Sequence, residues 1–232
     1  KLDLKAAEDK GWRIRETIKY VRRKNKMEDR LREILEYIEK KSANHDFNME
    51  EVDEIAEKIH ECFVAPDNFE PTPIVKITEA FGIPVYRTKN INVKHSGNIH
   101  IVDDKCEKVG KEKIILVDAE DVLPQQRFVI AHELGHYLFD YIGSDFQRYN
   151  QPFTCPYLKD NHEGKNEKIA NRFATSLLMP AQLFIKEHNN AVDTDDRKIY
   201  VIKYLSRLFQ VKEDSIIKRI KEVKVNEREK AC

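Results

Sequence analysis

The chain has 232 residues, which is enough for one substantial hydrophobic core with an appended helical part. Its 41 basic and 41 acidic residues give a formal net charge of zero, so no long-range field would hold it on DNA or on an anionic membrane. No apolar run has the roughly 18 residues that cross a bilayer, and the first residues lack the apolar core of a signal peptide. We therefore expect no membrane partner and no direct nucleic-acid binding, although a local basic patch would leave the latter open.

The cysteines of the chain are widely spaced and form no C-x-x-C pair. They are Cys62, Cys106, Cys155 and Cys232. This spacing argues against a disulfide framework and against a zinc site made of cysteines. Unpaired thiols are typical of a reducing compartment, so we expect a cytoplasmic protein.

Helical spacing of apolar residues dominates the N-terminal third. The pattern from about residue 9 to residue 41 predicts one long amphipathic helix or two shorter ones. Its basic middle, residues 22–26, is typical of a solvated face, with nucleic-acid contact as the alternative. Asn48 is a suitable N-cap for a second helix. A short helix from about Pro73 to Phe81 is expected to end at Gly82 in a left-handed conformation.

After Gly82 the spacing of apolar residues changes from the helical period to the alternation that is typical of β-strands. Ile83–Thr88, Ser96–Val102 and Lys113–Val117 are short β-rich segments. The turns between them are short and contain no obvious crossover helix, which predicts a small antiparallel sheet. With the helices around it, this sheet places the chain in the α+β class.

The remainder of the chain is predicted to be helical, with a polar loop from Gly143 to Gly164. Helices are expected over about 125–141, 166–179 and 197–225. A further helix is expected to start after Pro180, and the helix at 197–225 is expected to be broken near Gln210. The last part has the spacing of a helix-turn-helix, and a structural or partner-binding helical pair is the favoured alternative. DNA contact stays open there because its second helix carries three basic residues, Lys218, Arg219 and Lys221.

The segment Ala131-His132-Glu133-Leu134-Gly135-His136 contains the pattern H-E-x-x-H on an apolar helix. Histidines four residues apart share one helix face with Cβ atoms about 6 Å apart, so His132 and His136 can bind one ion at about 2.0 to 2.1 Å. Glu133 lies roughly 100° around the helix and can take a proton from a metal-bound water. Two core histidines bonded to carbonyl groups are the alternative.

A catalytic zinc of this kind needs a third protein ligand. Asp140 lies another turn along the helix, and the loop offers Asp160, His162 and Glu163. Glu167 is better placed, because it opens the next helix, which can deliver a carboxylate rigidly. Asn171 follows one turn later, where it could hold a ligand histidine. The alternative for Glu167 is a carboxylate that complements the helix dipole.

Two stretches in this order, residues 127–138 and 167–180, resemble the ImmA/IrrE family of metallopeptidases. The resemblance extends from about Asn48 to Ile220. It implies a zincin-like fold with Zn2+ bound by His132, His136 and Glu167, and Glu133 as the general base. It also implies an endopeptidase that cuts a helix-turn-helix transcriptional repressor of a phage or mobile element.

The resulting division of the chain has three parts. Residues 1–47 form an N-terminal helical extension outside the resemblance, residues 48–190 the zincin-like metallopeptidase domain, and residues 191–232 a C-terminal helical segment. A DNA-binding or antitoxin-type regulator with a purely structural metal is the alternative function. The group that would stabilise the transition state stays open among Tyr149, Tyr157, His162 and Arg172. Strand residues 96–102 could hold an extended substrate by main-chain pairing.

Overall fold

The computed structural model describes residues 24–42, 47–65, 69–89, 96–154 and 164–223. Its first element is a helix at residues 24–42, whose apolar face buries Leu31, Ile34 and Ile38 in the same core as the later helices. The predicted helix before residue 24, including the basic residues 22 and 23, lies outside these ranges. The residues expected to form an N-terminal extension therefore contribute part of their apolar face to the main core.

Two helices follow where the sequence predicts them. Helix α2 (Met49–Phe63) starts with a capping box, in which the Asn48 side chain accepts from the Glu51 N–H and the Glu51 carboxylate accepts from the Asn48 N–H. Helix α3 (Ile74–Ala80) is followed by Gly82 at φ +73°, a left-handed conformation that glycine adopts without strain.

The sheet is mixed, which corrects the expectation of an antiparallel one. It contains β1 (Val85–Thr88), β2 (Gly97–Ile101), β3 (Lys113–Asp118) and β4 (Phe153–Thr154) in the order β1-β3-β2-β4. β2 is antiparallel to β3 and to β4, whereas β1 runs parallel to β3. The expectation failed because it assumed that strands adjacent in sequence pair with one another. β3 instead inserts between β1 and β2.

The segments between and after the strands are mostly helical. Short helix α4 (Asp104–Val109) joins β2 to β3, and α5 (Leu123–His136) continues into a π-helix (Tyr137–Tyr141). The predicted polar loop contains α6 (Asp145–Arg148) and β4, while its residues 155–163 lie outside the described ranges. The last four helices are α7 (Lys165–Leu178), α8 (Ala181–Thr194), α9 (Lys198–Phe209) and α10 (Glu213–Glu222). The domain boundary expected near residue 190 falls inside α8.

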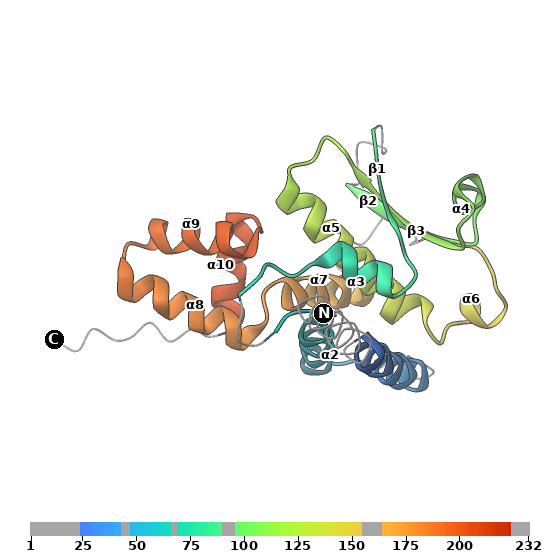
Figure 1. Cartoon of the computed structure of the whole chain (residues 1–232), viewed down its shortest axis with the longest axis horizontal. Helices are drawn as coiled ribbons and strands as arrows, with labels where there is room; N and C mark the ends of the chain where they lie inside the picture. The colour runs from blue at the N-terminus through green and yellow to red at the C-terminus, as the bar shows by residue number, and fades with distance from the viewer. Residues whose placement is uncertain (1–23, 43–46, 66–68, 90–95, 155–163, 224–232) are drawn as a thin grey trace, which may run out of the picture.

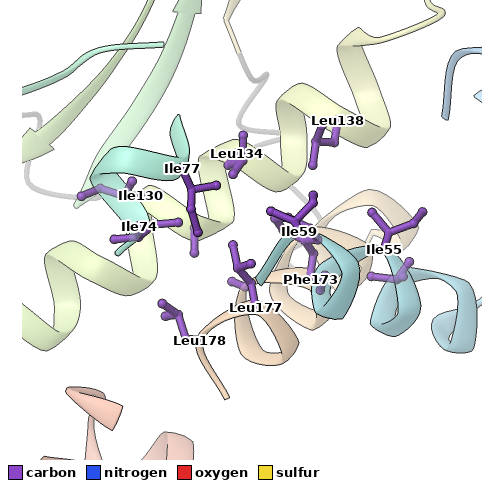
Figure 2. Close-up of a cluster of buried hydrophobic side chains, with 14 of the residues drawn as sticks. Ile55, Ile59, Ile74, Ile77, Ile130, Leu134, Leu138, Phe173, Leu177 and Leu178 are labelled. Atoms are coloured by element: carbon purple, nitrogen blue, oxygen red, sulfur yellow. The ribbon is translucent and has the colours of Figure 1, made fainter. Parts of the chain in front are cut away.

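Figure 1 shows the sheet on one side of the molecule, α5 and α7 beside it, and α8, α9 and α10 as a group at one end. The core lies where α2, α3, α5 and α7 meet (Figure 2). Its labelled residues are Ile55, Ile59, Ile74, Ile77, Ile130, Leu134, Leu138, Phe173, Leu177 and Leu178. Among the helices that the structure describes, none is both long enough and apolar enough to cross a bilayer.

The C-terminal helices have the predicted break, with Gln210 in a left-handed conformation between α9 and α10. Of the three basic residues that left DNA contact open, Arg219 is fully buried. Its guanidinium donates to the Met179 carbonyl at 3.0 Å and pairs with Glu222 at 3.3 Å. Arg219 therefore joins α10 to the rest of the fold, and only Lys218 and Lys221 of the predicted basic group are exposed.

Helices α5 and α7 approach closely at Gly135. A Cβ atom added at Gly135 would lie 3.0 Å from the Ala170 Cα and 3.3 Å from the Phe173 ring. The neighbour at 3.0 Å is backbone, which cannot move aside as a flexible side chain could. This close approach explains why a poor helix former occupies the middle of a buried helix.

Gly135→Ala should therefore destabilise the protein, even though alanine is the better helix former by about 1 kcal/mol. Forcing a methyl group into a packed core typically costs about 1 to 3 kcal/mol, so we expect a net loss of stability. Urea unfolding of both proteins measures the difference. A free energy of unfolding equal to or above that of the parent would contradict the close-packing account.

Candidate metal centre

Three side chains from two helices converge at the end of α5. The ligand atoms of His132, His136 and Glu167 all lie within 4.8 Å of one another. The two histidine Nε2 atoms are 3.0 Å apart, and Glu167 oxygens lie 3.4 Å from His132 Nε2 and 3.3 Å from His136 Nε2. The structure therefore brings together the three residues that the sequence predicted as metal ligands.

The other nitrogen of each imidazole faces an oxygen. His132 Nδ1 lies 3.1 Å from Asn171 Oδ1, and His136 Nδ1 lies 2.5 Å from Asp140 Oδ2. Both oxygens are acceptors, so the tautomer with the proton on Nδ1 satisfies both contacts. Each Nε2 then presents a lone pair to the shared space.

This arrangement fits a cation better than it fits an ordinary buried cluster. Two nitrogen lone pairs and a carboxylate that face one another repel unless a positive charge lies between them. When the Nε2 atoms of His132 and His136 carry protons instead of facing a metal ion, they donate to Glu167 and hold the pKa of its carboxyl well below its usual range. A bound cation would take the place of these two protons beside the ionised carboxylate. The three side chains could therefore hold one metal ion, with donor types that suit zinc.

Glu133 is almost entirely inaccessible to solvent, with 4 % of its surface exposed. One carboxylate oxygen accepts a hydrogen bond from the Ile99 N–H of β2 at 2.9 Å, which fixes its orientation. Burial raises the pKa of the Glu133 carboxyl, although the two histidines and the Ile99 N–H act in the opposite direction. A carboxylate with a raised pKa is suited to accept a proton and later release it.

The other candidate site residues, proposed as a third ligand or as the group that stabilises the transition state, lie in different places. Tyr157, Asp160, His162 and Glu163 lie outside the described residues. Tyr149 is 65 % exposed on the surface after α6. The guanidinium of Arg172 is bound by Asp53 and Glu222, so its charge is already compensated.

The proposed substrate edge is shorter than predicted. β3 covers one side of β2, and β4 covers only His100 and Ile101 on the other side. Main-chain pairing is therefore restricted to residues 97–99, where the Ile99 N–H already donates to Glu133.

Asp140 is the residue whose place sequence reasoning missed. It was set aside as a ligand because it lies one turn beyond His136, and no second role was assigned to it. Its spacing of four residues from His136 was the available signal, since such pairs meet on one helix face. The π-helix that includes Asp140 begins at Tyr137, directly after the second histidine.

An H-E-x-x-H helix beside a small sheet, with a carboxylate from a second helix, is characteristic of metallopeptidase-type proteins. The family of M78 peptidases, described as the IrrE N-terminal-like domain, matches residues 78–221. The chain therefore belongs to this family, as the ImmA/IrrE resemblance implied. Membership indicates a metallopeptidase-type or regulatory role.

One solved structure supports the same fold. It is a Mycobacterium tuberculosis transcriptional regulator with 16 % sequence identity and a TM-score of 0.50, matched over 80 % of this chain and 51 % of that chain. This chain thus spans about half the length of that regulator, and at this identity the likeness concerns the fold alone. No curated protein matches the sequence.

Asp140→Asn should weaken metal binding without removing a ligand. Loss of a charged partner at a ligand histidine typically lowers metal affinity about 10- to 100-fold. Competition with a chromophoric chelator measures the affinity. Asp145→Asn is the matched control, because the exposed Asp145 carboxylate pairs with Arg148 alone among the residues that the structure describes. Equal affinities for the Asp140 variant and the parent would show that this carboxylate does not support His136.

Proposed function

We propose that the protein is a zinc-dependent endopeptidase that hydrolyses a peptide bond in a helix-turn-helix transcriptional repressor in the cytoplasm. The observation that carries the proposal is the convergence of His132, His136 and Glu167 beside a buried Glu133. A bound zinc ion would polarise the scissile carbonyl and lower the pKa of its water. The repressor as substrate is supported by the family resemblance only.

Each residue of the chain has a separate task in this proposal. The two imidazoles and the Glu167 carboxylate hold the ion, while Asn171 and Asp140 orient the imidazoles through their Nδ1 atoms. Glu133 accepts the proton of the attacking water and returns it to the leaving amine. The Ile99 N–H keeps one Glu133 oxygen in place.

The zincin-like description of the core belongs to the same proposal. Its support is the family match together with the position of β2, which approaches the metal helix closely enough for the Ile99 contact. Residues 97–99 would hold a short extended segment of substrate beside Glu133.

A transcriptional regulator with a purely structural metal is the second candidate. It is favoured by the α9–turn–α10 pair and by the likeness in fold to a transcriptional regulator of known structure. The buried position of Arg219 weighs against DNA contact through α10. The two candidates differ in whether Glu133 is needed.

Zinc should stabilise the folded protein measurably. A ligand present at about 100 times its dissociation constant adds about 2.7 kcal/mol, which corresponds to a rise in Tm of roughly 5 to 10 °C for a chain of this size. Thermal unfolding after treatment with chelator, with and without added zinc, measures the shift. His136→Ala should abolish it. A shift that persists in this variant would mean that zinc binds elsewhere.

Glu133→Gln should keep the metal and lose the reaction. Removing a general base typically costs about 10²- to 10⁴-fold in rate, whereas glutamine preserves the shape of the side chain. The assay incubates the zinc-loaded protein with a helix-turn-helix repressor encoded beside it and follows the repressor by mass spectrometry.

Zinc content of the Glu133→Gln protein serves as the control in that assay. If the fully loaded parent leaves the repressor intact, the proposed substrate is wrong. If parent and variant cleave at equal rates, Glu133 is not the base.

A further inference from the structure

A groove of about 590 Å³ separates α10 from the helices that carry the metal centre. Its walls are formed by α5, α7 and α10, with Met49 at the start of α2. The groove is not part of the ligand cluster, and Asn171 is the one lining residue to which the proposed chemistry gives a task.

The groove borders the metal centre directly. Asn171, one of its lining residues, contacts His132 Nδ1 at 3.1 Å, and the Phe128 ring lies 6.4 Å from the His132 ring. Gln125, also in the lining, donates to the Ser96 hydroxyl at 3.2 Å, immediately before β2. An extended chain that lies along residues 97–99 could therefore continue past Ser96 into the groove.

The groove has a local excess of positive charge in a chain of zero net charge. Arg172 and Glu222 compensate each other at 3.1 Å. Three exposed lysines lie on its walls, Lys168, Lys212 and Lys218, and their ammonium groups form no hydrogen bond or ion pair with any residue that the structure describes. Asp214 is the remaining acidic residue of the lining, so three lysines face one carboxylate there.

We infer that this groove binds an acidic segment of the protein substrate that flanks the scissile bond. The inference rests on the proposed peptidase function and adds a substrate class to it. Aspartate or glutamate side chains of the segment would pair with the three lysines, while Phe128 and Met49 would contact its apolar parts. A polypeptide suits this lining better than a nucleic acid, because the one arginine of the lining, Arg172, is already engaged by Asp53 and Glu222 and is not available for bidentate binding of phosphates.

Peptide binding tests the inference without a known substrate. Zinc-loaded Glu133→Gln protein is titrated into a fluorescein-labelled peptide of alternating glutamate and alanine, and separately into a glutamine–alanine peptide of equal length. Three partly exposed ion pairs should favour the acidic peptide by about tenfold at low salt, and added salt should reduce the preference. Fluorescence anisotropy gives both dissociation constants.

A matched pair of triple variants places the effect in the groove. Lys168→Glu, Lys212→Glu and Lys218→Glu together should abolish the preference for the acidic peptide. Lys186→Glu, Lys198→Glu and Lys203→Glu change the net charge equally on exposed positions of α8 and α9 outside the lining, and should keep it. Thermal unfolding and zinc content check that each variant folds.

Three results would overturn the inference: equal affinity for the two peptides, equal loss in both triple variants, or lysine-dependent binding of a labelled DNA duplex in preference to the acidic peptide. Cleavage assays on the parent separate this result from the proposed function. Cleavage without acidic preference contradicts the groove inference alone, whereas acidic preference without cleavage by the zinc-loaded parent contradicts the peptidase proposal.

Discussion

The close approach of α5 and α7 at Gly135 is the constraint on which the rest of the site depends. With no side chain at Gly135, the Ala170 backbone lies only 3.0 Å from the place that a Cβ atom would take, which is closer than most Cβ contacts in proteins. This contact brings the first turn of α7 beside the last turn of α5. Glu167 then reaches the two histidines, and the apolar residues on either side of the contact fill the core shown in Figure 2.

Helix α7 also carries polar and charged side chains that surround the centre. Glu167 faces both imidazoles, Asn171 holds one of them, and Arg172 pairs with Asp53 of α2 and with Glu222 of α10. A shift of α7 would therefore disturb the ligand set and both neighbouring helices together. Glu167 and Arg172 are partly buried, and polar groups in such positions are most stable when each has its partner, which favours one fixed arrangement.

Local patterns in the sequence predicted much of the fold. The N-cap at Asn48 and the left-handed Gly82 depend on neighbouring residues only, and the structure has both. The spacing of His132 and His136 is equally local. Their convergence with Glu167 joins two helices, and the sequence alone supported it by the order of motifs and by resemblance. The roles of these residues in metal binding and catalysis stay predictions.

The features that sequence reasoning missed depend on contacts between distant segments. β3 inserts between β1 and β2, and no periodicity within a strand reveals its neighbours. Arginine is usually exposed, yet Arg219 is buried. Its burial is possible because the Met179 carbonyl and the Glu222 carboxylate accept hydrogen bonds from its guanidinium. Asp140 was set aside as a third ligand, while its contact is with the back of the His136 ring. Helices α4 and α6 are too short to leave a periodic signal.

X-ray absorption at the zinc edge of the zinc-loaded protein tests the central claim most directly, because it reports the atoms bound to the metal. The account predicts nitrogen and oxygen neighbours at about 2.0 to 2.2 Å, with the multiple scattering of two imidazoles. Replacing His132 and His136 by alanine should remove that imidazole signal. A sulfur neighbour at about 2.3 Å would instead indicate binding by cysteines and would contradict a centre made of His132, His136 and Glu167.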